Sequence, residues 1–114
     1  MPKVYVVNRS GHDFSAALQF GSPLIFLTEG EVDRMKVNKI YREICTKLEG
    51  SGADDYLLQT SYAVVNMIES AIFARKHGRL NLLIYKASRN GEGRYLSRQV
   101  LLDELLTCGI KESE

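Results

Sequence analysis

Two kinds of hydrophobic periodicity alternate along the chain. Short apolar runs rich in β-branched and aromatic residues predict buried strands, whereas longer segments with apolar residues every three or four positions predict helices. The predicted strands cover residues 3–8, 24–27, 56–59, 80–85 and 94–100. The predicted helices cover residues 14–18, 31–49, 61–77 and 101–106.

Residues that favour turns and helix ends lie between these segments. Gly50 and Gly78 follow the two long helices and predict left-handed C-caps, because glycine adopts that conformation freely. Thr60 or Ser61 offers a hydroxyl as the N-cap of the second long helix. Residues 90–93, Asn-Gly-Glu-Gly, predict a hairpin loop that leads into a polar strand suited to a sheet edge.

Alternation of strands with helices of 15 or more residues indicates a parallel sheet, because parallel strands need crossover connections. We therefore predict a small three-layer α/β domain whose four- to five-stranded sheet is mostly parallel, flanked by helices and closed by an antiparallel edge strand. The pattern predicts one domain over residues 1–114, with residues 110–114 as a frayed tail. It does not determine the strand order.

Composition agrees with one soluble globular domain and excludes several classes of protein. Of the 114 residues 45% are hydrophobic and 25% charged, and this aliphatic content excludes a disordered chain. The formal net charge of +1 gives no global electrostatic reason to expect nucleic acid as a partner. No apolar segment has the length of a signal peptide or a membrane span, so we expect a cytoplasmic protein with no membrane partner.

The cysteines and histidines predict no metal site and no cofactor. Cys45 and Cys108 are the only cysteines and lie far apart in the sequence, so they form no C-x-x-C pair. Together with His12 and His77 they match no zinc-ligand spacing. So few cysteines are typical of a reducing compartment.

Two blocks of sequence carry a resemblance to a known group. The first runs from Tyr5 through the Asn-Arg-Ser-Gly-His-Asp stretch to Ser15 and closes at Phe20 and Gly21. The second covers residues 71–85, with the sequence Ala-Ile-Phe-Ala-Arg-Lys-His-Gly-Arg-Leu-Asn-Leu-Leu-Ile-Tyr. In these blocks the chain resembles short uncharacterised bacteriophage proteins. The resemblance implies a viral origin and brings no catalytic residues with it.

Polar loops follow the predicted parallel strands. Ligands of open α/β sheets bind at the carboxyl ends of the strands, where four loops of this chain are expected to meet. These loops cover residues 8–13, 28–31, 59–62 and 86–89. The candidate ligand-binding residues are Asn8, Arg9, Ser10, Gly11, His12, Thr28, Glu29, Thr60 and Ser61.

The loop from Arg9 to Asp13 has the most varied chemistry. Gly11 allows backbone N–H groups to approach an anion at a helix N-terminus, with Arg9 and Ser10 as further donors, so a phosphate group suits this loop. Asp13 would repel phosphate or simply cap the helix, and the loop lacks both the dinucleotide-binding glycines and the P-loop lysine. A plain capped turn is the alternative.

A catalytic interpretation of the same loop is weaker. His12, with Asp13, Glu29 and Ser10 around it, could form an acid–base or nucleophilic group, but no spacing rule connects them. We therefore assign no catalytic residue.

The second long helix is apolar on nearly every side, which predicts that every side is buried. Ala63, Ser70 and Ala74 form a strip of small residues, with Met67 beside it, that suits close approach of a partner helix. Symmetric dimers are the commonest oligomers, so we expect a homodimer through this helix. The alternative is that the segment after Gly11 or the C-terminal helix covers it.

The sequence thus favours a protein that binds a small anionic ligand, a nucleotide or nucleotide-derived signal. A bacteriophage protein of this kind could sequester a signalling molecule of its host. The alternative is a non-enzymatic protein–protein interaction module, such as a host-factor inhibitor or a virion-associated component. A small phosphodiesterase-like enzyme that uses His12 is a weaker alternative.

Overall fold

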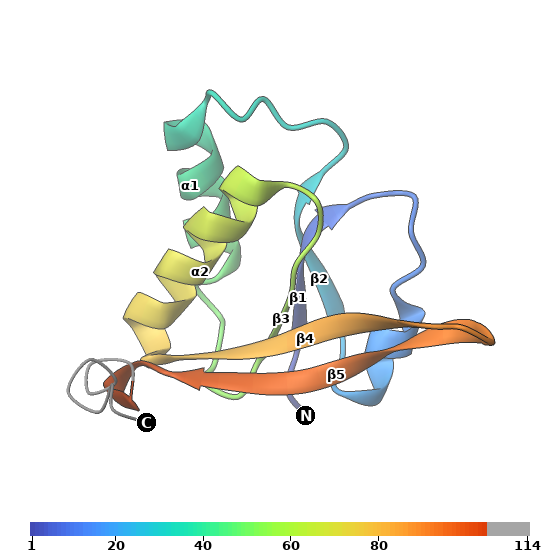
Figure 1. Cartoon of the computed structure of the whole chain (residues 1–114). Coiled ribbons are helices and arrows are strands. Elements are labelled where there is room, and N and C mark those ends of the chain that lie inside the picture. The colour runs from blue at the N-terminus through green and yellow to red at the C-terminus, as the bar shows by residue number, and fades with distance from the viewer. Residues whose placement is uncertain (105–114) are drawn as a thin grey trace, which may run out of the picture.

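The computed structural model describes residues 1–104 and has a five-stranded sheet in the order β2-β1-β3-β4-β5 (Figure 1). The elements, in chain order, are β1 (Val4–Arg9), η1 (Ser15–Gln19, a 3₁₀ helix), β2 (Leu24–Glu29), α1 (Val37–Lys47), β3 (Tyr56–Leu58), α2 (Ala63–His77), β4 (Arg79–Ser88) and β5 (Gly91–Leu101).

Four strands of the sheet run parallel, as predicted. Tyr5 of β1 pairs with Ile25 of β2 on one side and with Leu57 of β3 on the other, and Leu58 pairs with Leu83 of β4. β5 pairs with β4 in the antiparallel direction and forms the edge of the sheet. The α/β class, the mostly parallel sheet and the antiparallel edge strand are therefore confirmed.

The two faces of the sheet bury different elements. α1 and α2 pack side by side on the face that carries Tyr5 and Val7, and their contribution to that core includes Ile44 and Phe73 (Figure 1). On the opposite face, η1 and the residues around it cover the side chains that alternate with these in β1. That second core contains Val4, Val6, Phe14, Ala17, Leu58, Leu83 and Tyr95.

The first long helix is shorter than predicted. It begins at Val37 instead of residue 31, because Asp33 folds the preceding segment into a turn. The Asp33 carboxylate accepts the Met35 amide at 3.0 Å, and its carbonyl accepts the Lys36 amide at 3.0 Å. Such local bonds compete with the helix ladder, as is typical of aspartate.

The predicted glycine cap of α1 is wrong. Gly50 is not left-handed, and the helix ends at Lys47. The Leu48 carbonyl instead accepts the Ser51 hydroxyl at 2.7 Å and the Lys76 ammonium at 2.6 Å. The nearby Ser51 hydroxyl and the Lys76 ammonium, which is distant in the sequence, thus replace the glycine cap.

The second long helix begins at Ala63, and its N-cap residue is Tyr62, which makes no side-chain capping bond. The prediction that Thr60 or Ser61 caps this helix is therefore wrong. At the other end Gly78 is left-handed, with φ 69°, and donates its amide to the Ala74 carbonyl, as predicted.

The hairpin between β4 and β5 has a shorter loop and longer strands than predicted. Ser88 pairs with Gly91, so the loop consists of two residues instead of residues 90–93. β4 continues far beyond its last pairing with β3, and the ribbon of β4 and β5 projects from the body of the molecule (Figure 1). Of the predicted helix over 101–106, Leu101 still belongs to β5, residues 102–104 are helical, and the rest lies outside the described residues, as does the predicted frayed tail.

Candidate functional site

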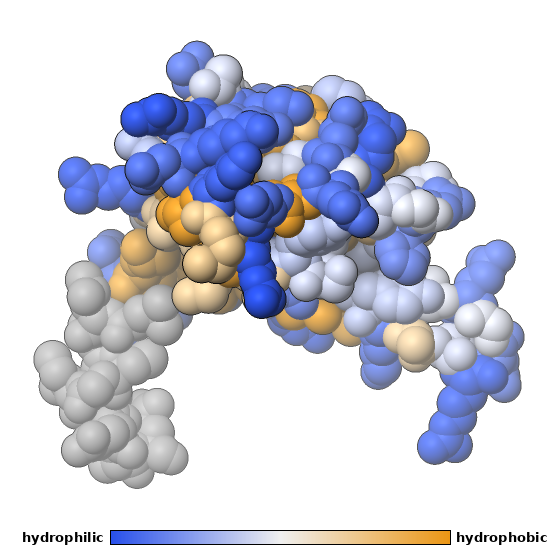
Figure 2. Space-filling view, turned by 90° about the horizontal axis from the view of Figure 1, so that it is seen from above, coloured by the Kyte–Doolittle hydropathy of each residue, from blue (hydrophilic) through white to orange (hydrophobic). Residues whose placement is uncertain are grey.

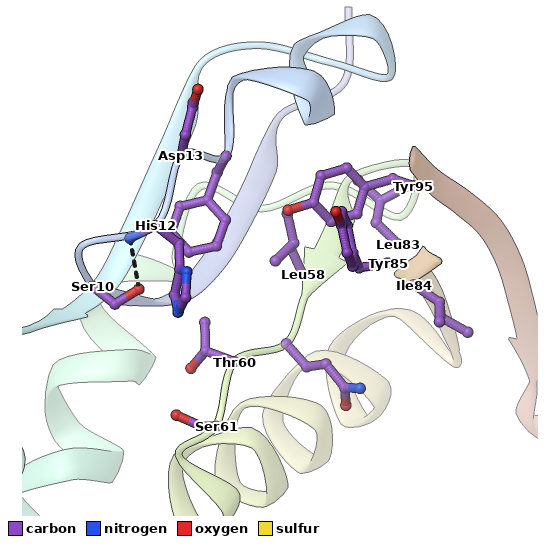
Figure 3. A pocket seen from close by; sticks show the side chains of 12 residues that line it. Ser10, His12, Asp13, Leu58, Thr60, Ser61, Leu83, Ile84, Tyr85 and Tyr95 are labelled. Carbon is purple, nitrogen blue, oxygen red and sulfur yellow. Dashed lines mark hydrogen bonds between the residues drawn. The ribbon is translucent and has the colours of Figure 1, made fainter. Parts of the chain in front are cut away.

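A pocket of about 450 Å³ opens where the chain reverses its direction across the sheet. From β1 the chain crosses to β2 on one side, and it returns to β3 on the other, so the loops after β1 and β3 diverge. Crevices at such points bind ligands in open α/β sheets. The pocket is lined by Ser10, His12, Asp13, Phe14, Leu58, Gln59, Thr60, Ser61, Leu83, Ile84, Tyr85 and Tyr95 (Figure 3). Seen from this end, hydrophilic side chains cover most of the loops and the tip of the projecting ribbon (Figure 2).

The loop after β1 supplies one wall of the pocket. Asp13 accepts the Ser15 amide at 2.8 Å, and this bond holds the pKa of its carboxyl below the usual value. The Asp13 side chain points away from the pocket, whereas the imidazole of His12 extends toward Thr60 (Figure 3). The Asp13 carboxylate therefore occupies the first backbone N–H of η1, where the sequence predicted an anion, although the N-cap residue of η1 is Phe14.

The loop after β3 forms the opposite wall and is held by one side chain. Asn66 donates its amide to the Thr60 carbonyl at 2.6 Å and accepts the Thr60 backbone N–H at 3.3 Å. These two bonds hold the loop through the Thr60 backbone and use neither the Thr60 hydroxyl nor the Ser61 hydroxyl. The hydroxyl of Thr60 is buried and has no hydrogen-bond partner.

Aromatic rings from the ribbon complete the pocket. Tyr85 and Tyr95 pair across β4 and β5, with ring centroids 5.5 Å apart in an edge-to-face arrangement. A side chain at Gly93 would collide with the Tyr85 ring, so glycine is required where this ring lies along the ribbon. Burial, together with Tyr85 and Asp13, raises the pKa of Tyr95, which keeps its hydroxyl protonated.

The structure does not bring the remaining candidate residues to this pocket. Asn8 donates to the Thr28 hydroxyl at 2.9 Å and to the Gly30 carbonyl at 3.1 Å, and Thr28 donates to the Val7 carbonyl at 2.8 Å. Gly11 is absent from the lining as well. Thr28 and Glu29 line a separate hollow beside α1.

Arg9, the guanidinium predicted to meet an anion, already has partners. Its Nε lies 2.7 Å from the carboxylate of Glu29, and its guanidinium carbon lies 4.0 Å from the centre of the Phe26 ring. Both charged side chains of the pair are more than half exposed. The pair is therefore a surface ion pair at the end of β1 and β2.

A smaller hollow of about 190 Å³ adjoins the pocket on the helix side of the sheet. It shares Gln59, Leu83 and Ile84 with the pocket, and Glu69 is among its lining residues. Glu69 is 2% exposed, and its Oε1 atom has no hydrogen-bond partner. Burial alone raises the pKa of this carboxyl to about 8.

Sequence reasoning missed Glu69, although a signal was present. Val65, Glu69 and Phe73 are spaced by four residues, and the structure buries all three against the sheet. Charged residues are seldom fully buried, so a glutamate in the buried row of a helix marks a candidate functional residue. The missed tyrosines on the pocket wall had no comparable signal, since their position depends on how far β4 and β5 extend.

The residues predicted for a dimer interface lie on two sides of α2. Ala63 and Met67 are exposed, the latter by 73%, whereas Ser70 and Ala74 are half-buried against the molecule itself. No helix within residues 1–104 is long and apolar enough to cross a membrane. Over the same residues, no three histidine, cysteine, aspartate or glutamate side chains gather as metal ligands would.

Comparison with known proteins identifies the family of the chain and nothing more specific. No curated protein and no solved structure matches it. One family model, described as Phage Pam3 gp32-like protein, matches residues 2–101 and so spans the whole sheet and both long helices. This match confirms the predicted kinship with bacteriophage proteins: the chain belongs to the Phage Pam3 gp32-like protein family.

Proposed function

We propose that the protein binds a nucleotide or a nucleotide-derived molecule in the pocket between the loops after β1 and β3. The observation that carries this proposal is the pocket's lining, which combines aromatic rings with hydroxyl and amide groups at the carboxyl edge of a parallel sheet. Rings provide apolar faces for a base, and hydroxyls and amides provide the few polar contacts that orient a ligand.

The charge of the lining favours the base and sugar over the phosphate as the main point of contact. Among the described residues that line the pocket, His12 and Asp13 are the only ionisable groups besides the tyrosines. Asp13 points away and Arg9 is paired with Glu29 (Figure 3). A phosphate group would therefore lie at the open mouth of the pocket, within reach of His12.

For a bacteriophage protein, we propose that this binding sequesters a nucleotide signal in the host cytoplasm. No reaction needs to follow. Among the described residues, none forms a hydrogen bond with the imidazole of His12, whose ring neighbour is Phe14 at 6.3 Å between centroids. A general base is normally oriented by such a bond, so the phosphodiesterase alternative has less support than binding.

A thermal-shift screen against nucleosides and mono-, di- and cyclic nucleotides tests the proposal, followed by calorimetry on each compound that raises the melting temperature. A ligand at about 100 times its Kd stabilises the folded state by about 2.7 kcal/mol. Ser61→Ala and Tyr85→Ala should weaken binding, whereas Lys39→Ala, in the separate hollow beside α1, should not. The proposal fails if no compound shifts the transition, or if the pocket variants bind as the wild type does.

A second candidate is an interaction module that forms a homodimer through α2. It is favoured by Met67, which is 73% exposed between the exposed Ala63 and Ala71 along one side of the helix. Light scattering after size exclusion tests it with Met67→Glu and, at the half-buried position, Ala74→Glu. Each should convert a dimer to a monomer, because an unpaired charge is costly in an apolar interface. A wild-type monomer at micromolar concentration contradicts the homodimer.

A further inference from the structure

The hollow that contains Glu69 is the least expected feature of the interior. α2 buries this carboxyl group over β3 and β4, in the same row as Val65 and Phe73. The walls carry three uncharged polar side chains, namely Gln59, Asn66 and Ser70, together with Leu57, Leu82, Leu83 and Ile84. No positive charge lies among them to pair with a carboxylate.

Buried polar atoms are almost always hydrogen-bonded, so each exception needs an explanation. Among residues 1–104, two buried side-chain oxygen atoms have no partner: Oε1 of Glu69 and Oγ1 of Thr60. Both belong to residues that line the two adjoining hollows, and elsewhere in that part of the chain every such atom is paired. Unmet hydrogen-bonding capacity is thus concentrated at the end of β3.

We propose that Glu69 receives the edge of a guanine-type base, whose ring N–H and 2-amino group present two parallel donors to one carboxyl group. The inference rests on the proposed function and specifies the base within it. The base would lie beside Gln59, which lines both hollows, so that its N–H edge reaches Glu69 while its faces stay against the rings of the larger pocket, with the sugar and phosphate toward the mouth.

An ionised carboxylate is chemically complementary to the N–H edge of a guanine-type base. An ionised carboxyl group accepts hydrogen bonds and donates none, so it complements two adjacent N–H donors. Hypoxanthine lacks the 2-amino donor and leaves one oxygen unpaired, and adenine presents an acceptor at the ring nitrogen. Sites built to bond a donor discriminate strongly against analogues that lack it, because their own buried group is then left unpaired.

Burial holds the carboxyl group largely protonated at neutral pH in the empty protein, since its pKa is about 8. The residues that face it from β3, β4 and α2 are uncharged, so no neighbouring side chain stabilises either state. Binding of two N–H donors therefore favours ionisation and releases a proton. The apparent affinity for such a base should rise several-fold between pH 6 and pH 8.

Calorimetry with guanosine 5′-monophosphate and inosine 5′-monophosphate tests the inference, because the two probes differ only by the 2-amino group. The wild type should bind the guanine nucleotide at least about tenfold more tightly. Glu69→Gln should abolish this difference, because the amide offers one acceptor and one donor in place of two acceptors. Glu43→Gln removes the same charge from an exposed position on α1 and should keep the preference.

Melting curves of each variant show whether it is folded, so a loss of preference is not confused with a loss of structure. If both nucleotides bind the wild type equally, or if Glu69→Gln keeps the preference, the inference is overturned while nucleotide binding stands. If no nucleotide of any kind binds the wild type, the proposed function itself fails.

Discussion

The carboxyl edge of the sheet has two corners, which differ in whether their buried polar side chains are hydrogen-bonded. In the closed corner, at the ends of β1 and β2, Asn8 and Thr28 are buried and bond to each other, to Gly30 and to Val7. In the open corner, where β3 ends beside the middle of β4, one buried oxygen of Thr60 and one of Glu69 have no partner. The adjoining hollows lie at the open corner.

The difference follows from strand length. β1 and β2 stay paired to their last residues, Arg9 and Glu29, so side chains at their ends face each other and bond. β3 pairs with β4 only at Leu57 and Leu58, and β4 then continues without it. Beyond Leu58 the chain therefore pairs with neither β1 nor β4, although both strands continue. A polar side chain at a strand end is bonded within the fold where two strands stay paired to their ends, and it lacks that partner where one strand stops before its neighbours.

The largest effect that we expect is a decrease in stability with rising pH, caused by Glu69 in the open corner. Its pKa is 4.5 in a free side chain and about 8 in the folded protein, so the folded state binds the proton more tightly. The stabilisation is complete below pH 4.5 and is lost as the pH rises toward 8. Between pH 5 and pH 9 it amounts to roughly 4 kcal/mol at 1.36 kcal/mol per pKa unit.

Urea denaturation at a series of pH values, performed on the wild type and on Glu69→Gln, measures this dependence. The difference between the two free energies of unfolding isolates Glu69 from other groups, such as His77, whose pKa burial lowers. Glu69→Gln should be the more stable protein at pH 9. Parallel curves for the two proteins would mean that Glu69 is paired or solvated.

In the closed corner, Thr28→Val should destabilise the protein by about 1–3 kcal/mol. The change keeps the shape of the side chain but removes the donor to the Val7 carbonyl and the acceptor of the Asn8 amide. Denaturation at one pH suffices as the measurement. An unchanged free energy of unfolding would show that the bonds of this corner do not contribute to stability.

Thr60→Val is the matched substitution in the open corner, and its expected effect on stability is smaller. The hydroxyl has no partner to lose, so the free energy of unfolding should change by less than about 0.5 kcal/mol or increase slightly. The same denaturation experiment compares the two valine variants directly. A loss as large as that of Thr28→Val would remove the distinction between the corners.

The sheet could be predicted from the sequence because each parallel strand is a short apolar run of its own. Alternate residues of β1, such as Tyr5 and Val6, pack into different cores, which explains why the whole run is apolar. The start of α1 could not be predicted from its apolar spacing, because the turn at Asp33 depends on local side-chain bonds. The end of α1 depends on Lys76, which is distant in the sequence.

The candidate site was only partly predictable, for a related reason. The position of Ser10, His12, Thr60 and Ser61 beside one pocket follows from the strand directions, and strand directions follow from the periodicity. The early end of β3 does not follow from the periodicity, because it depends on the length of β4 relative to that of β3. The sequence alone therefore gave the same weight to Thr28 as to Thr60.

The last prediction concerns Arg9, the residue that the sequence favoured most as a contact for an anion, and here we expect little change in either stability or affinity. Exposed ion pairs contribute about 0–1 kcal/mol, so Arg9→Ala should change the free energy of unfolding by no more than about that amount. Because Glu29 and Phe26 already hold the guanidinium, we expect the affinity for guanosine 5′-monophosphate to change by less than about twofold. Calorimetry on Arg9→Ala and on Glu29→Gln, which frees the guanidinium, measures both effects. A tenfold loss in Arg9→Ala would mean that this side chain leaves Glu29 for the phosphate, and the closed corner would then belong to the binding site.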